Sequence, residues 1–161
     1  MHSDSEEMLY LLGIMAQKIS QSPSELDGQS MGNAIYGLQG MSSKYTEVRA
    51  VVASLTNKIN SSSIGLNAQE LGNSLYGLQN MMSDSYEVKE LMRALTHKVK
   101  ECRHDLASQE IGNALFGIQE MNADVVETRM LLEALTSKVY SSSAIMDPQG
   151  VGNAIYGLKN M

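Results

Sequence analysis

The sequence is poor in the residues that most often carry chemistry or covalent constraints. Its 161 residues include one cysteine, three histidines, two prolines, one phenylalanine and no tryptophan. The single cysteine, Cys102, cannot form an intramolecular disulfide, which excludes a disulfide-stabilised scaffold. Cys102 and His104 alone do not have the spacing of a metal site, so we expect neither a bound metal nor another cofactor.

Long hydrophobic runs are also missing. No segment is apolar over the length of a membrane span, and the first residues lack the charged-then-apolar pattern of a signal peptide. Hydrophobic residues make up 43% of the chain and charged residues 19%, a balance that favours a folded core over disorder. We therefore expect a soluble intracellular protein, cytoplasmic or organellar, with no membrane partner.

Basic residues are outnumbered by acidic ones, 12 to 18, which gives a net charge of −6. Affinity for a phosphate backbone comes largely from lysine and arginine, so this balance disfavours a non-specific nucleic-acid binder. The three histidines share no repeat position and no recurring acidic partner, and the serines concentrate in predicted loops. We therefore expect no enzymatic activity.

What the sequence does contain is an internal repeat with a fixed period. One nine-residue stretch recurs as 31–39, 71–79, 111–119 and 151–159, and its first glycine stands at positions 40 residues apart: Gly32, Gly72, Gly112 and Gly152. A period of this size is typical of helical arrays in which each repeat is one supersecondary unit.

Each repeat contains two helical patterns. The longer one has apolar residues at i, i+3, i+4 and i+7, as in Val48, Val51, Val52 and Leu55, and predicts an amphipathic helix over 6–20 and its equivalents. A glutamate near its start and a lysine near its end (Lys18, Lys58, Lys98 and Lys138) suit the helix dipole, which is the role we expect for these lysines.

The shorter pattern predicts a helix over about 28–41 and its equivalents, begun by the N-cap residues Asp27, Asn67 and Asp147 and by the weaker Ala107. Its expected core face holds Met31, Ala34, Ile35, Leu38 and Met41. Glycine inside a helix costs roughly 0.5–1 kcal/mol relative to alanine, so the two glycines of each copy need a reason. They fall on the two flanks of the helix, where the absence of a side chain would let neighbouring helices approach closely.

These patterns predict an all-α fold. We expect a right-handed superhelical α-solenoid of about four 40-residue two-helix repeats, similar in architecture to armadillo and tetratricopeptide arrays. The chain 1–161 would form one domain made of a helix at 6–20, repeats at 26–65, 66–105 and 106–145, and a helix at 146–161. Neither end carries a polar capping repeat, so the chain is expected either to be a segment of a longer array or to associate head to tail with other copies.

The candidate binding residues lie on the face of the shorter helix opposite its core face. Amide side chains can form paired hydrogen bonds with peptide groups or base edges, and aromatic rings can stack. Alternatively, the asparagines could bond to the neighbouring repeat and the tyrosines could cover the adjacent glycines, which would make the row structural. The row consists of Gln29, Asn33, Tyr36, Gln69, Asn73, Tyr76, Gln109, Asn113, Phe116, Gln149, Asn153 and Tyr156.

The segment from Leu66 to Asn80, together with Asp147-Pro-Gln in the last repeat, resembles the first-helix consensus of the octotricopeptide, heptatricopeptide and FAST-kinase-like helical repeats. The resemblance covers the shorter helix of every repeat, about a third of the chain. It implies a helical solenoid, and it implies single-stranded RNA as a partner because members of that group are mostly organellar RNA-binding proteins.

Three functions follow from these observations. The variable positions beside the row include Glu70, Glu110 and Glu120, which favour a protein or peptide partner over phosphate. We therefore expect first a non-catalytic interaction module that binds a protein or peptide along the face of the shorter helices. Single-stranded RNA binding is the alternative, and a purely structural role in assembly is the third.

Overall fold

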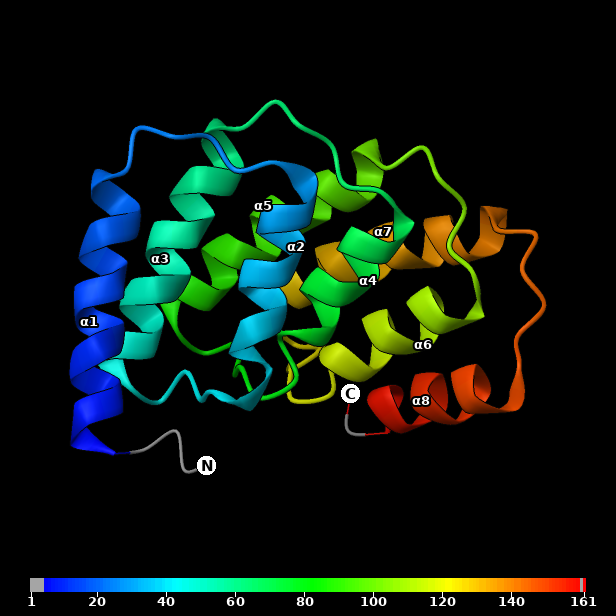
Figure 1. Cartoon of the computed structure of the whole chain (residues 1–161). Helices are drawn as coiled ribbons and strands as arrows, with labels where there is room; N and C mark the ends of the chain where they lie inside the picture. Colours follow the sequence, from blue (N-terminus) through cyan, green and yellow to red (C-terminus); the bar gives the residue numbers. More distant parts are fainter. Residues whose placement is uncertain (1–4, 160) are drawn as a thin grey trace.

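A computed structural model describes residues 5–159 and 161 of the chain (Figure 1). This described part contains helices and no strand, so the prediction of an all-α fold is confirmed. No helix in it is both long enough and apolar enough to cross a membrane. The elements are α1 (Glu6–Gln21), α2 (Gly28–Tyr36), the 3₁₀ helix η1 (Gly37–Gly40), α3 (Thr46–Ser61), α4 (Ala68–Tyr76), α5 (Tyr86–Glu101), α6 (Ser108–Gly117), α7 (Val126–Ser141) and α8 (Pro148–Leu158).

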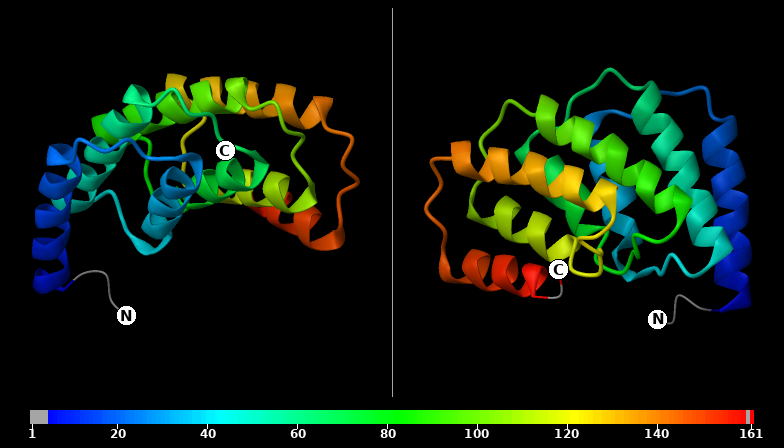
Figure 2. Two further views of the ribbon diagram at one scale, coloured as in Figure 1. Left: turned by 45° about the horizontal axis from the view of Figure 1, so that its top comes forward. Right: turned by 180° about the vertical axis from the view of Figure 1, so that it is seen from behind.

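The helices form two layers. The 16-residue helices α1, α3, α5 and α7 pack side by side in one layer, and α2, α4, α6 and α8 pack side by side in the other. Each helix therefore contacts the helix 40 residues further along the chain. Figure 2 shows that both layers are curved, with the shorter helices on the inner side of the arc.

The hydrophobic core lies between the two layers. The apolar positions predicted for the long helices are buried in α3 and α5, as are Leu71 and Leu75 on the facing side of α4. Burying one such side chain stabilises the fold by about 1.5–3 kcal/mol. Because every repeat contributes the same positions, one continuous core runs through the stack.

The shorter helices end earlier than the sequence suggested. The first was expected to extend to residue 41, but the α-helix stops at Tyr36 and continues as the 3₁₀ helix η1; the next two stop at Tyr76 and Gly117. Ala34 and Met41 are half-buried, not fully buried as predicted. Short 3₁₀ segments of this kind are common at the ends of α-helices.

The starts of the shorter helices follow the predicted capping. Asn67 accepts the Glu70 backbone N–H at 2.9 Å, and Glu70 accepts the Asn67 N–H at 2.8 Å, which completes a capping box. Asp27 accepts the Ser30 N–H at 2.7 Å, and this hydrogen bond lowers the pKa of the Asp27 carboxyl. Ala107 has no capping side chain, as expected, although its N–H donates to Glu110 at 3.1 Å.

The glycines lie where consecutive short helices touch. A Cβ at Gly32 or Gly72 would stand only 3.2 or 3.1 Å from backbone atoms of Glu70 or Glu110 in the following helix. A Cβ at the second glycine, as at Gly77, would overlap the Ile35 carbonyl of the preceding helix. The first glycine thus clears space for the next repeat and the second for the previous one, as the flank argument predicted.

Replacing Gly77 with alanine should destabilise the protein by about 1–3 kcal/mol, because the new methyl group overlaps backbone that cannot move aside. Gly37 is the matched control, since it holds the same repeat position with nothing within 4 Å of its added Cβ. Gly37→Ala should leave stability unchanged or raise it by up to about 1 kcal/mol. Urea unfolding at low protein concentration measures both; equal effects would contradict the role assigned to the glycines.

The recurring lysines join one repeat to the next. Lys98 of α5 is only 4% exposed and donates to the carbonyls of Ser62 at 3.0 Å and Ile64 at 2.8 Å, just after the end of α3. Lys58 and Lys138 bond in the same way to carbonyls that follow α1 and α5, including the Cys102 carbonyl at 2.7 Å. These lysines were expected only to interact with the dipole of their own helix. They also donate hydrogen bonds to carbonyls of the preceding repeat.

Two buried serines make a second set of links between repeats. The Ser43 hydroxyl accepts the Met82 N–H at 2.9 Å, and the Ser83 hydroxyl accepts the Asn122 N–H at 2.9 Å. Both serines lie in the loop after a short helix and are almost fully buried. Polar groups in these loops are therefore paired across repeats as well as within them.

Lys98→Met should cost about 1–3 kcal/mol, because it leaves two carbonyls without their donor while keeping most of the side-chain volume. Lys18→Met is the control. Lys18 holds the same repeat position, but its side chain is exposed and makes no hydrogen bond in the part of the chain that is described. It should change stability by less than about 0.5 kcal/mol. Denaturant unfolding of the two variants measures both changes in stability. A loss of stability for Lys98→Met as small as that for Lys18→Met would refute the hydrogen-bonded link between repeats.

Candidate interaction surface

The predicted row of side chains lies along the inner layer of helices. Its four glutamines are exposed; Asn33 is exposed and the other three asparagines are half-buried. Tyr36 and Tyr156 are exposed, whereas Tyr76 and Phe116 between them are half-buried. The structure thus brings the twelve predicted residues together on one face of α2, α4, α6 and α8.

The amides of this row have no bonding partners within the described residues. None of the eight side chains makes a hydrogen bond there, and the asparagines do not bond to a neighbouring backbone, as the structural alternative required. Each amide can donate two hydrogen bonds and accept two. We call these residues the amide row: Gln29, Asn33, Gln69, Asn73, Gln109, Asn113, Gln149 and Asn153.

The aromatic side chains, in contrast, contact one another. Tyr36, Tyr76, Phe116 and Tyr156 form a continuous stack with ring centroids 5.7, 5.5 and 5.5 Å apart and interplanar angles of 17–20°. Such offset pairs contribute about 0.5–1.5 kcal/mol each beyond the area they bury. Phe116 stacks as closely as its tyrosine neighbours, so the stack does not depend on a hydroxyl group. The aromatic third of the predicted row therefore serves contacts between repeats.

Part of the amide row lines a cleft between α6 and α8. The cleft has a volume of about 200 Å³ and is lined by Gln109, Asn113, Gln149 and Asn153, with Asp147 and Gly150 at the start of α8. Four unpaired amides from two helices converge on it, so it offers several donors and acceptors to one ligand.

Charges near the amide row are mainly negative. Glu70, Glu110 and Asp147 stand at the starts of α4, α6 and α8, where their carboxylates accept backbone N–H groups. The one basic residue in these four helices and their last turns is Lys159, whose Nζ lies 3.6 Å from the centre of the Tyr156 ring. Phe116 stacks on one face of the Tyr156 ring, so Lys159 covers the other face.

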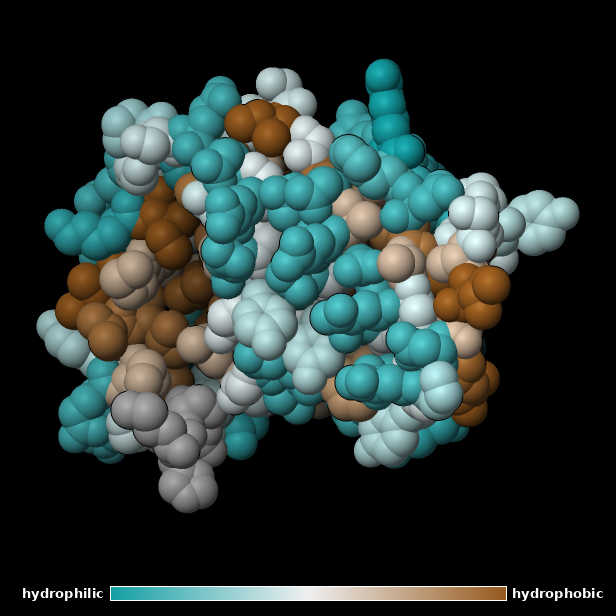
Figure 3. All heavy atoms as spheres, turned by 45° about the vertical axis from the view of Figure 1, so that its right-hand side comes forward, coloured by the Kyte–Doolittle hydropathy of each residue, from teal (hydrophilic) through white to brown (hydrophobic). Residues whose placement is uncertain are grey.

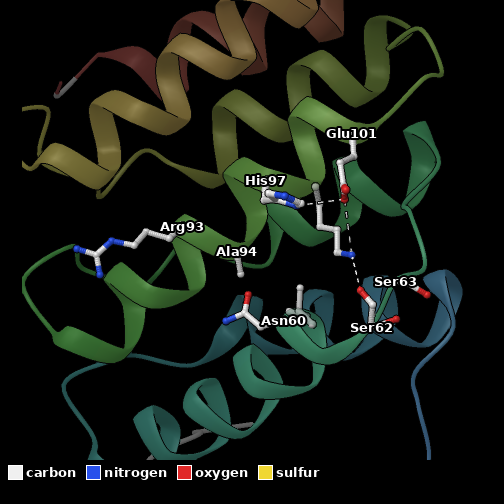
Figure 4. Close-up of a pocket in the computed structure, with 9 residues that line it drawn as sticks. Asn60, Ser62, Ser63, Arg93, Ala94, His97 and Glu101 are labelled. Carbon is white, nitrogen blue, oxygen red and sulfur yellow. Dashed lines mark hydrogen bonds and ion pairs between the residues drawn. The ribbon is translucent and has the colours of Figure 1, made fainter.

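A different groove lies on the outer layer between α3 and α5 (Figure 4). His97 Nδ1 stands 3.2 Å from the Glu101 carboxylate at its rim, while Lys98 points toward Ser62. The equivalent groove between α5 and α7 has Ser137 and Ser141 in place of His97 and Glu101. The groove itself thus recurs with the repeat, but its titratable pair does not.

Neither a metal cluster nor a match to a known protein identifies this surface. Among residues 5–159 and 161, no three His, Cys, Asp or Glu side chains gather closely enough to hold a metal ion. Comparison with models of protein families, with curated proteins and with solved structures found no match.

Sequence reasoning found the face but missed part of how it is built. The spacing of 40 residues predicted that the tyrosines align, yet their stacking depends on the distance between helices, which the sequence does not state. The lysine links were also missed, although their signal was present: a lysine that recurs in every repeat, 36 residues after a loop carbonyl.

Proposed function

We propose that the chain is a non-catalytic interaction module, a right-handed α-solenoid of about four two-helix repeats, that binds an extended peptide segment of a protein partner along the amide row. The observation that carries this proposal is the set of eight accessible amides without partners on one curved face. A purely structural row would be expected to use these groups, and the aromatic neighbours are used in that way.

An extended peptide suits the amide row because its backbone presents a donor and an acceptor at every residue. An asparagine or glutamine side chain can pair with both, through its carbonyl oxygen and its NH₂ group. Successive repeats place such a side chain at regular intervals along the inner face, so a peptide lying across α2, α4, α6 and α8 can be bound at several points.

The electrostatics favour a basic peptide. The chain has a net charge of −6, and the carboxylates of Glu70, Glu110 and Asp147 stand beside the row. Complementary charge mainly raises the association rate and the specificity. We therefore propose a peptide with lysine or arginine among its side chains.

Single-stranded RNA, the alternative that the family resemblance suggested, is less well supported. Binding of bases by stacking requires open ring faces, and the faces between Tyr36 and Tyr156 are taken by neighbouring rings. Binding of phosphates requires cations. Lys58, Lys98 and Lys138 lie in the layer of long helices, away from the amide row, and donate hydrogen bonds to carbonyl oxygens there.

The test is a fluorescence-polarisation titration of the purified chain against three labelled pools: basic peptides, acidic peptides and single-stranded RNA of mixed sequence. We expect the basic peptides to bind most tightly and the affinity to fall with added salt. The double variant Asn73→Ala, Asn113→Ala should lower this affinity about ten- to a hundredfold, because up to four hydrogen bonds of about 0.5–1.5 kcal/mol each are lost.

Asn57→Ala is the control, since Asn57 is an exposed asparagine on α3 in the outer layer. It should leave the affinity unchanged. RNA binding tighter than peptide binding would overturn the proposal in favour of the alternative. Peptide binding that is insensitive to the double variant would remove the amide row as the site.

A further inference from the structure

The two ends of the stack expose apolar side chains at positions that are buried elsewhere. In α8, Val151, Ile155 and Leu158 are 46%, 66% and 39% exposed. Their equivalents Leu71 and Leu75 in α4 and Leu78 just after it are fully buried. α8 therefore presents a core face that nothing in the described structure covers.

The opposite end shows the complementary pattern. Leu11 and Met15 of α1 are 52% and 45% exposed, whereas Leu91 and Leu95 at the same positions of α5 are fully buried. A hydrophobic patch is visible on the left of the space-filling view in Figure 3. In the interior this face of a long helix belongs to the core that it shares with the preceding short helix, as in the contacts of α2 with α3 and of α4 with α5.

The two exposed faces are thus the two halves of one repeat. Within residues 5–159 and 161, no long helix stands after the short helix α8 and no short helix stands before the long helix α1. The start of α1 differs from the start of α7 by 120 residues, three whole periods, so an α1 helix placed after α7 continues the register without a gap. From this we infer that a second copy of the chain docks head to tail, with its α1 on α7 and α8 and its α2 on α8.

The polar contacts of the interior repeats can be reproduced at this junction. Lys18 of the second copy would meet the Ser142 and Ala144 carbonyls, the equivalents of those that Lys98 binds. Arg129 would meet the second copy's Glu7, as Arg49 meets Glu87 at 3.7 Å. Tyr36 of the second copy would extend the ring stack from Tyr156 once Lys159 leaves that ring.

The glycines also leave room for a second copy. An added Cβ at Gly37 or Gly152 has nothing within 4 Å, while the equivalent glycines inside the stack face backbone of a neighbouring helix. At the junction, Gly37 would face the Ile155 carbonyl of the other copy, as Gly77 faces the Ile35 carbonyl. Both ends therefore have the open space beside a glycine that a neighbouring helix fills inside the stack, but no helix of the same copy fills it there.

The proposed junction joins two different surfaces, so it is heterologous and generates chains or rings of copies, not a closed symmetric dimer. The junction contacts are made by α1, α7, the core face of α8 and the facing flanks of α2 and α8, whereas the proposed peptide contacts are made by the amide row on the inner face, and a variant at Gly37 or Gly152 changes no residue of that row. A failure of peptide binding and a failure of self-association are therefore separate results.

Sedimentation velocity over a range of protein concentrations tests the junction with two variants, each blocking one end. Gly37→Leu fills the space needed at the head and Gly152→Leu fills the space needed at the tail, and both sites are open in a single copy. We expect the unmodified chain to grow beyond a dimer, each variant alone to stay monomeric, and an equal mixture of the two to stop at a heterodimer, because one intact head and one intact tail remain.

Gly65→Leu is the control, since Gly65 is an exposed loop glycine that also has nothing within 4 Å. This variant should associate like the unmodified chain. A chain that stays monomeric at every concentration would overturn the proposal. So would variants that associate on their own, or a mixture that remains monomeric while circular dichroism shows both variants folded.

A further variant should strengthen the junction. Arg93 of α5 forms an ion pair with Glu127 of α7, but the equivalent of Arg93 in α7 is Glu133, which would face Glu7 of the second copy. Glu133→Arg replaces a repulsion with an ion pair and should tighten association about two- to fivefold. Glu133→Gln should lie between the two, and weaker association by Glu133→Arg would contradict the docking geometry.

Discussion

The close approach of consecutive short helices determines the rest of this structure. Two glycines per repeat remove the side chains that would separate α2, α4, α6 and α8, and backbone meets backbone at Gly72 and Gly77. The aromatic rings can then stack at 5.5–5.7 Å. The stack curves toward the short helices, which is the direction expected when the layer with glycines at its contacts packs more closely than the layer of long helices (Figure 2).

The same constraint explains why one face of the short helices stays open. Between neighbouring repeats, the flanks of the short helices meet backbone and their core face meets the long helices, so inside the stack the inner face is the one left open. On this inner face the aromatic rings stack on one another beside the glycines, whereas the amide side chains make no hydrogen bond within the described residues.

Much of the fold could be predicted from the sequence because the period is fixed and the apolar spacing is strongly helical. The long helices, the caps at Asn67 and Asp147 and the position of the glycines on the helix flanks all follow from local rules. The early end of α2 could not be predicted, since apolar spacing does not fix where α-helical hydrogen bonding gives way to 3₁₀ hydrogen bonding at a helix end. The carbonyl partners of Lys98 and the stacking of Tyr76 were equally out of reach, because both require the distance between helices. The 40-residue period also made the face that carries the candidate site predictable. It did not predict that the aromatic rings on this face would contact one another while the amides would make no hydrogen bond within the described residues.

The lysine links give the stack a direction. The carbonyls that follow α1, α3 and α5 each accept a hydrogen bond from a lysine of the next long helix, so these helix ends are completed by the repeat after them. In a linear array stability is approximately a sum over nearest neighbours. Loss of one repeat therefore exposes the helix end behind it, and unravelling that starts at α7 proceeds toward the N-terminus as a sequence of such losses. Opening from α1 removes no such completion from α3, so the two ends of the array are not equivalent in how they come apart.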